Sequence, residues 1–168
     1  MKYEIIYLSK SGNTTILAEA IASMLPAEDT KITDLTLEEA SGGADVSFVG
    51  FDVESGTVPL KIMDALDYTE GKIVALFATC FLAPTEEDRV SIERRVVPFL
   101  PNECDYRGLF LCAGALPENV FDGIKKNLSA HPNHADARAL LDRYENSIGH
   151  PDAQDIENLK EFIQAILQ

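Results

Sequence analysis

The sequence predicts a doubly wound α/β fold, in which helices cover both faces of a parallel sheet. Short β-rich runs alternate with helical patterns along the whole chain. One run, 72–78, is almost entirely apolar, as expected for a strand buried on both faces. The chain has 168 residues, of which 46% are hydrophobic, and no linker or internal repeat divides it. We therefore expect a single domain over residues 1–168 with a continuous core.

Five segments have the pattern of strands. The first, Y-E-I-I-Y-L, is apolar except for one acid, and the third follows the turn-forming residues 41–43. A helical pattern separates most of these segments, and such crossovers join parallel neighbours in one sheet. The expected strands are 3–8, 30–35, 46–51, 72–78 and 106–113.

Helical segments follow the strands at the expected places. In the first, Leu17, Ile21 and Leu25 share one face, and Pro26 stops the helix. Thr85 precedes three acids, which is typical of a capped helix start. The expected helices are 14–25, a short one after Pro59, 85–99 and 152–167.

An insertion departs from this minimal pattern. Residues 116–149 separate the fifth strand from the last helix, where a short loop would suffice. Two further helical patterns, at 118–128 and 135–146, lie within it. We expect these helices to cover one edge of the functional site.

The loop after the first strand carries the chemistry. Backbone N–H groups at a helix start, together with small hydroxyl side chains, form an anion site. In an open α/β sheet, ligands bind at the carboxyl ends of the strands. We therefore predict that the loop wraps a terminal monophosphate. Its residues are Ser9, Lys10, Ser11, Gly12, Asn13 and Thr14.

Other phosphate loops do not match. The sequence lacks G-x-x-x-x-G-K-[ST], which argues against a nucleotide triphosphatase, and G-x-G-x-x-G, which argues against a dinucleotide site. A phosphatase-type Cys–Arg loop and the aspartate pair of a receiver domain are also missing. The alternative interpretation is that these polar residues only form a turn and a helix cap.

The segment 6–14, I-Y-L-S-K-S-G-N-T, resembles the phosphate-loop signature of flavodoxins. This resemblance implies a three-layer flavodoxin-like sheet of order 2-1-3-4-5 that binds flavin mononucleotide (FMN). Residues 49–57 and the pairs His131-Pro132 and His150-Pro151 resemble a subgroup of bacterial flavodoxin-like proteins. Some members of that subgroup are thought to serve as electron-transfer accessories to reductases.

The resemblance also implies which loops hold the flavin ring, because flavodoxins clamp it with the loops after strands three and four. Gly56 is a candidate for the backbone position that flips toward the ring, since glycine tolerates positive φ; the alternative is an ordinary turn. The implied contacts are Asp52, Val53, Glu54, Ser55, Gly56 and Thr57 in one loop, and Thr79, Cys80, Phe81 and Leu82 in the other.

Two departures from the family stand at these positions. The chain has no Trp, and Asp52 occupies a position where the subgroup leads us to expect an aromatic residue. Phe81 is the only ring in its loop, and it is either the stacking residue or a hydrophobic plug. Carboxylates of Asp52 and Glu54 near a reduced flavin would disfavour its negative charge by ~1 kcal/mol or more. The alternative is that both are solvated loop acids.

Composition limits the remaining possibilities. The formal net charge of −14 argues against nucleic acid and membrane partners and suits docking to a basic patch on a redox protein. Three unevenly spaced cysteines and three scattered histidines predict neither a disulfide framework nor a metal site. The absence of a signal-peptide pattern predicts a cytoplasmic protein.

We therefore expect an FMN-binding electron-transfer protein that exchanges electrons with a reductase partner, and no catalytic acid or base is assigned. One alternative is a flavin-dependent oxidoreductase that turns over a small substrate with NAD(P)H. The other is a flavin-free binding module that has kept the fold, which the missing aromatic residues favour.

Overall fold

The computed structural model describes residues 1–54, 56–131 and 135–168, and its strands form one sheet of order β2-β1-β3-β4-β5. Each neighbouring pair is parallel. This arrangement confirms the predicted doubly wound fold and strand order. The strands are β1 (Tyr3–Leu8), β2 (Thr30–Asp34), β3 (Val46–Asp52), β4 (Ile73–Cys80) and β5 (Asp105–Ala113).

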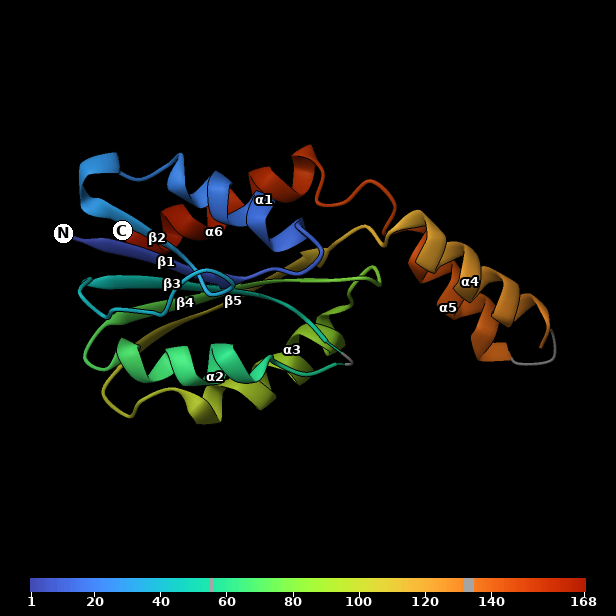
Figure 1. The fold of residues 1–168 in the computed structure, drawn as a ribbon, viewed down its shortest axis with the longest axis horizontal. Helices are drawn as coiled ribbons and strands as arrows, with labels where there is room; N and C mark the ends of the chain where they lie inside the picture. The colour runs from blue at the N-terminus through green and yellow to red at the C-terminus, as the bar shows by residue number, and fades with distance from the viewer. Residues whose placement is uncertain (55, 132–134) are drawn as a thin grey trace.

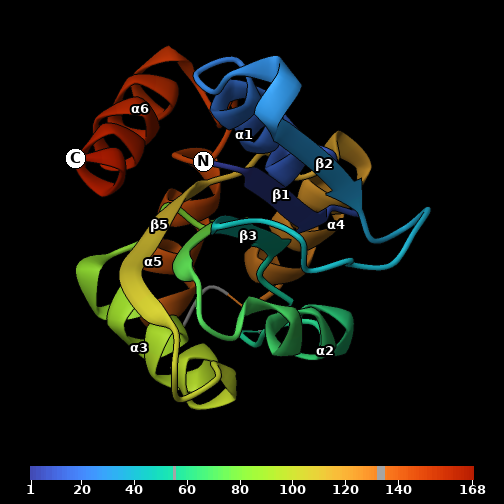
Figure 2. The same ribbon diagram turned by 90° about the vertical axis from the view of Figure 1, so that its left-hand side faces the viewer.

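Helices cover both faces of the sheet (Figures 1 and 2). One face packs against α1 (Asn13–Ala22) and α6 (Ala153–Leu167), and the other against α2 (Leu60–Leu66) and α3 (Glu86–Val96). The apolar side chains accordingly form two buried clusters, one on each side of the sheet. Short 3-10 turns complete the connections at Ala27–Asp29, Asp67–Thr69 and Val97–Phe99.

Strand β4 lies between two neighbours and is buried on both faces, which confirms the expectation from its apolar sequence. The Phe77 ring of β4 fills the space above Gly50 of β3. A Cβ atom at Gly50 would lie 2.2 Å from the Phe77 ring, so only glycine fits this position without a shift.

The predicted cap at Thr85 is confirmed, and α6 begins with a similar cap. The Thr85 hydroxyl accepts a hydrogen bond from the Asp88 amide, and the Asp88 carboxylate accepts one from the Thr85 amide. Asp152 caps α6 in the same reciprocal way with Asp155. These capping boxes satisfy amides that the helix leaves unpaired.

The insertion forms two helices, α4 (Glu118–Ser129) and α5 (Ala135–Glu145), close to the predicted limits. They lie side by side and project beyond the carboxyl ends of the strands (Figure 1). No residue of α4 is buried.

No helix among the described residues is long and apolar enough to cross a membrane.

Candidate functional site

The register of the sheet brings three segments to one edge. Leu8 at the end of β1 pairs with Phe51 of β3, and Asp52 pairs with Thr79 of β4. The loop that follows β1 therefore lies next to Asp52, as the strand order requires.

The carboxylate of Asp52 points into this loop. Its Oδ2 atom accepts hydrogen bonds from the backbone amides of Lys10 at 2.8 Å and Ser11 at 2.9 Å. The hydroxyl of Ser11 donates to the same oxygen at 2.9 Å. The loop thus binds an anion, and that anion belongs to the chain itself.

The second carboxylate oxygen is bound by hydroxyl groups alone. Asp52 Oδ1 accepts from Thr14 Oγ1 at 2.5 Å, from Thr79 Oγ1 at 3.1 Å and from Ser9 Oγ at 3.3 Å. We call the set of donors formed by Ser9, Lys10, Ser11, Thr14 and Thr79 the anion cradle.

The cradle is closed to solvent where it holds the carboxylate. Asp52 is 5% exposed, Thr14 0% and Thr79 2%. Burial alone raises the pKa of the Asp52 carboxyl, but the hydrogen bonds from Thr14, Ser11 and Lys10 outweigh it and lower the pKa below its ordinary value. Asp52 is therefore ionised at neutral pH, and because it is buried it is not the solvated loop acid of the alternative interpretation.

The turn before α1 has the predicted geometry. Gly12 adopts a φ of 86°, which glycine tolerates without a steric penalty, and α1 begins at the next residue. The amide of Gly12 donates to Ser9 Oγ at 3.1 Å, and that of Asn13 donates to Ser11 Oγ at 3.1 Å. The two serine hydroxyls therefore link the helix start to the carboxylate.

The side chain of Asn13 is directed elsewhere. Its amide group donates to the carbonyl oxygen of Ala115 at 3.0 Å and is buried. A Cβ atom at Gly114 would lie 2.6 Å from the side-chain amide nitrogen of Asn13, so a glycine at this position leaves space for the Asn13 side chain. Asn13 joins the loop to the end of β5 rather than contributing its side chain to the cradle.

The charged side chain of the loop pairs outside the cradle. Lys10 Nζ lies 2.7 Å from Glu54 Oε1, and the two side chains are 68% and 41% exposed. The cradle itself contains hydroxyls and amides, so no fixed positive charge balances the buried carboxylate at contact distance among its described donors.

A cavity of about 340 Å³ lies beside the cradle. It brings together both of the loops that were expected to hold a flavin ring, and it adds side chains from α3 and α5. Asp52 and the described cradle donors are not among its lining residues. The lining consists of Val53, Gly56, Cys80, Phe81, Leu82, Asp88, Ser91, Ile92, Arg95, Arg143 and Tyr144.

The loop after β3 forms a tight turn at the cavity. The amides and carbonyls of Glu54 and Thr57 bond each other at 3.1 Å and 2.8 Å. Gly56 has a φ of 70°, and its carbonyl oxygen accepts a hydrogen bond from the Arg95 guanidinium. Ser55, also expected in the site, lies outside the described residues.

The loop after β4 supplies Cys80, Phe81 and Leu82 to the cavity. The Cys80 thiol donates to the Leu82 carbonyl at 3.0 Å, and burial raises its pKa to about 11. Cys80 is therefore a neutral thiol and a poor nucleophile. Phe81 is half-buried and is the aromatic ring that this loop presents to the cavity.

Helix α5 anchors the insertion to the same loop. Arg143 Nε donates to the Ala83 carbonyl at 3.1 Å, and its terminal nitrogen lies 2.5 Å from Asp88 Oδ2. The Ala83 amide donates back to the Arg143 carbonyl at 3.1 Å. The insertion therefore closes one side of the cavity, as the sequence led us to expect.

Sequence reasoning missed Asp88, Arg95 and Arg143 of the cavity, because these helix side chains reach it only through the way α3 and α5 pack against the two loops. It placed the Asp52 side chain at the flavin ring, whereas in the structure the donors of the loop after β1 bind the Asp52 carboxylate. The signal was present: Asp52 ends a strand next to β1, and a strand end beside a donor-rich loop suits an acceptor side chain.

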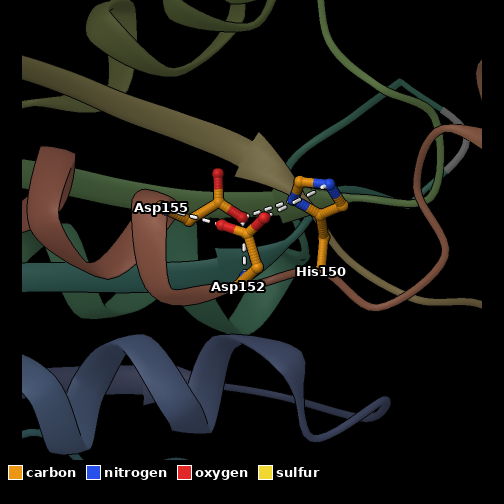
Figure 3. A group of neighbouring side chains, drawn as sticks. All are labelled: His150, Asp152 and Asp155. Carbon is orange, nitrogen blue, oxygen red and sulfur yellow. Dashed lines mark hydrogen bonds and ion pairs between the residues drawn. The ribbon is translucent and has the colours of Figure 1, made fainter.

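One group of three potential metal ligands occurs among the described residues: His150, Asp152 and Asp155, whose ligand atoms lie within 4.8 Å of one another (Figure 3). These atoms already have structural partners. His150 Nδ1 lies 2.5 Å from Asp155 Oδ2, and both carboxylates cap the start of α6. His134 lies outside the described residues.

The chain is similar to known proteins over nearly its whole length. The flavodoxin-like domain-containing protein BilS of Clostridioides difficile (strain CD3) is 25% identical over 172 residues, covering 99% of this chain and 97% of that protein. The BilS protein of Clostridium symbiosum (strain WAL-14163) is 25% identical over 179 residues, covering 97% and 94%.

Solved structures share the fold. General stress protein 14 of Treponema denticola, in complex with FMN, aligns over 99% of both chains with a TM-score of 0.54 and 11% identity. A flavoprotein of Lactobacillus acidophilus NCFM, also in complex with FMN, covers 66% of this chain and 93% of its own, with a TM-score of 0.52 and 20% identity. A short-chain flavodoxin associated with a bacterial microcompartment covers 99% and 97%, with a TM-score of 0.55 and 14% identity.

The sequence model described as the flavodoxin domain matches residues 4–164. Together with the strand order and the donor-lined loop after β1, this match shows that the chain belongs to the flavodoxin family.

Proposed function

We propose that this chain is a flavin-dependent electron carrier that takes FMN at the carboxyl edge of its sheet and exchanges electrons with a protein partner. The observation that carries the proposal is the anion cradle next to a cavity lined by both ring-contact loops. Hydroxyl and amide donors of this kind suit a phosphate group. FMN, when bound, supplies one-electron chemistry.

The residues have distinct parts in this proposal. Ser9, Ser11, Thr14 and Thr79, with the Lys10 amide, would bind the phosphate. The cavity would exclude water from the ring with Val53, Phe81, Leu82 and Ile92, while the guanidinium groups of Arg95 and Arg143 keep a positive charge at its wall.

The proposed partner is a redox protein that docks by a basic patch. Acidic residues outnumber basic ones 28 to 14 in the whole chain, yet the two signs nearly balance on α4 and α5. The acidic surplus therefore lies on the α/β body, which is the surface we assign to docking. Electron delivery should then slow as ionic strength rises.

The test is titration of flavin-free protein with FMN and riboflavin, followed by flavin fluorescence. Saturable binding of FMN supports the proposal, and NAD(P)H oxidation without an added reductase would instead favour a stand-alone oxidoreductase. If neither flavin binds at high micromolar concentration, the carrier proposal is wrong.

The second candidate is a flavin-free binding module, and the position of Asp52 favours it. Because the Asp52 carboxylate accepts hydrogen bonds from all of the cradle donors, these donors need no ligand as an acceptor. This candidate predicts a colourless purified protein whose thermal stability does not change when FMN is added.

A further inference from the structure

The Asp52 carboxylate lies where a ligand phosphate would have to bind. Six hydrogen bonds from five residues converge on its two oxygens. A carboxylate offers about four lone-pair directions, so these donors saturate it. The same donors are the ones that would hold a phosphate in this loop.

A phosphate and the carboxylate cannot share the cradle. A phosphate monoester carries about −1.5 to −2 charges near neutral pH, and two anions at contact distance repel strongly where water is excluded. The ammonium group nearest in the loop, that of Lys10, is paired with Glu54 at 2.7 Å. The cradle therefore has no described cation at contact with Asp52 that could neutralise both groups.

We propose that the Asp52 carboxylate competes with a ligand phosphate for the anion cradle. A phosphorylated ligand must displace this carboxylate, so the wild-type chain discriminates weakly between FMN and riboflavin and exchanges FMN readily. The proposal rests on the proposed function only in naming FMN as the ligand, because the competition applies to any phosphate group that enters the cradle.

The alternative is that Asp52 only holds the loop after β1 against β3 and β4, and that a phosphate binds elsewhere. The two interpretations differ in one measurable respect. Internal competition predicts that removal of the carboxylate strengthens phosphate binding. A purely structural role predicts that removal of the carboxylate loosens the loop and weakens phosphate binding, or leaves phosphate binding unchanged.

The first experiment measures the dissociation constants of FMN and riboflavin for the wild type, Asp52→Ser and Asp52→Asn. The readout is the preference for FMN, expressed as the riboflavin constant divided by the FMN constant. We expect this preference to rise by about tenfold or more in Asp52→Ser, because like-charge contact opposes phosphate entry in the wild type. An unchanged or lower preference in both Asp52 variants would overturn the proposal.

Asp34→Ser is the matched control. Asp34 also ends a strand next to β1, and it accepts hydrogen bonds from Thr36 at 2.8 Å and 2.7 Å rather than from the cradle. The substitution removes the same charge nearby, and the FMN preference should stay within about threefold of the wild type. If the FMN preference rose equally in this control, the effect would come from the loss of any nearby negative charge, and the proposal would be overturned.

A second readout uses orthophosphate and no flavin. The melting temperature of each protein is measured in phosphate and in chloride at equal ionic strength, because a ligand that binds only the folded state raises it. We expect phosphate to raise the melting temperature of Asp52→Ser more than that of the wild type, whose rise reflects only the general stabilisation of folded proteins by phosphate. An equal rise in both proteins would contradict internal competition.

This arm compares each variant with itself, so it remains decisive if the variants are less stable than the wild type. It also separates the two proposals. If none of the proteins binds a flavin, the proposed carrier function is wrong. The rise in melting temperature in phosphate still decides whether Asp52 competes with phosphate for the anion cradle.

Discussion

The hydroxyl of Thr14, in the first turn of α1, donates a 2.5 Å hydrogen bond to the carboxylate of Asp52 at the end of β3, and both side chains are buried. This contact joins the start of the helix to a strand distant in sequence. Because the acceptor is ionised and shielded from water, the bond is stronger than a bond between neutral groups. It is the shortest link in the cradle.

Removal of this hydroxyl should destabilise the fold. Thr14→Val leaves a buried carboxylate with one donor fewer, and we expect a loss of about 1.5–3 kcal/mol in the free energy of unfolding. The matched control is Thr69→Val, whose buried hydroxyl donates to the neutral carbonyl of Leu66 at 2.6 Å. The control should lose only about 1 kcal/mol. Urea denaturation measures both, and equal losses would argue against a special strength of the Thr14 bond.

Low pH should lower the free energy of unfolding, in part through protonation of Asp52. Its pKa is lowered in the folded state, so its ionisation stabilises the fold fully above the unfolded-state pKa of about 4. That contribution is lost as the pH falls through the folded-state pKa. The wild type should therefore exceed Asp52→Asn in stability at about pH 6, and the gap should narrow below about pH 4. A gap that stays at its pH 6 value well below about pH 4 would show that the stabilisation does not depend on the charge of Asp52.

Gly50→Ala should be strongly destabilising, because the new Cβ would lie 2.2 Å from the Phe77 ring in the interior of the sheet. We expect a loss of about 1–3 kcal/mol or more in the free energy of unfolding. In a Phe77→Leu background the same substitution should cost less, since the ring that it meets is gone. Additive losses in this double-mutant cycle would mean that the clash is not the cause.

Arg143→Ala should loosen the insertion while the α/β body stays folded. The guanidinium links α5 to Ala83 and Asp88 but is partly exposed, so we expect a change of at most about 1 kcal/mol in global stability. Hydrogen exchange of the described amides of α4 and α5 should accelerate by about tenfold. Arg107→Ala, which removes a surface pair with Asp105, is the control and should leave this exchange unchanged.

Cys80 should resist alkylation although it lines the cavity. With a pKa of about 11, only about one thiol in a thousand is ionised near pH 8, and the thiolate is the reactive form. Mass spectrometry after iodoacetamide treatment should show Cys80 reacting far more slowly in the folded protein than in urea. Equal rates in the two conditions would mean that the thiol is neither buried nor raised in pKa.

Local patterns in the sequence were sufficient to determine the elements of this fold. The alternation of apolar runs with amphipathic segments predicted the strands and helices, and Thr85 with its acids predicted the cap of α3. Gly12 and the small hydroxyl residues around it predicted the tight turn before α1. These features depend on residues a few positions apart, so they can be read directly from the chain.

Only the tertiary structure decided what the loop binds. The side chain of Asp52 could have faced the flavin cavity or the loop, and its direction is set by donors about forty residues earlier, at Lys10 and Ser11, and by Thr79 on the next strand. The cavity likewise combines two loops with Arg95 and Arg143 from separate helices. Such sites depend on the register of the sheet and on the burial of a charge among distant hydrogen-bond donors, which no local pattern in the sequence records.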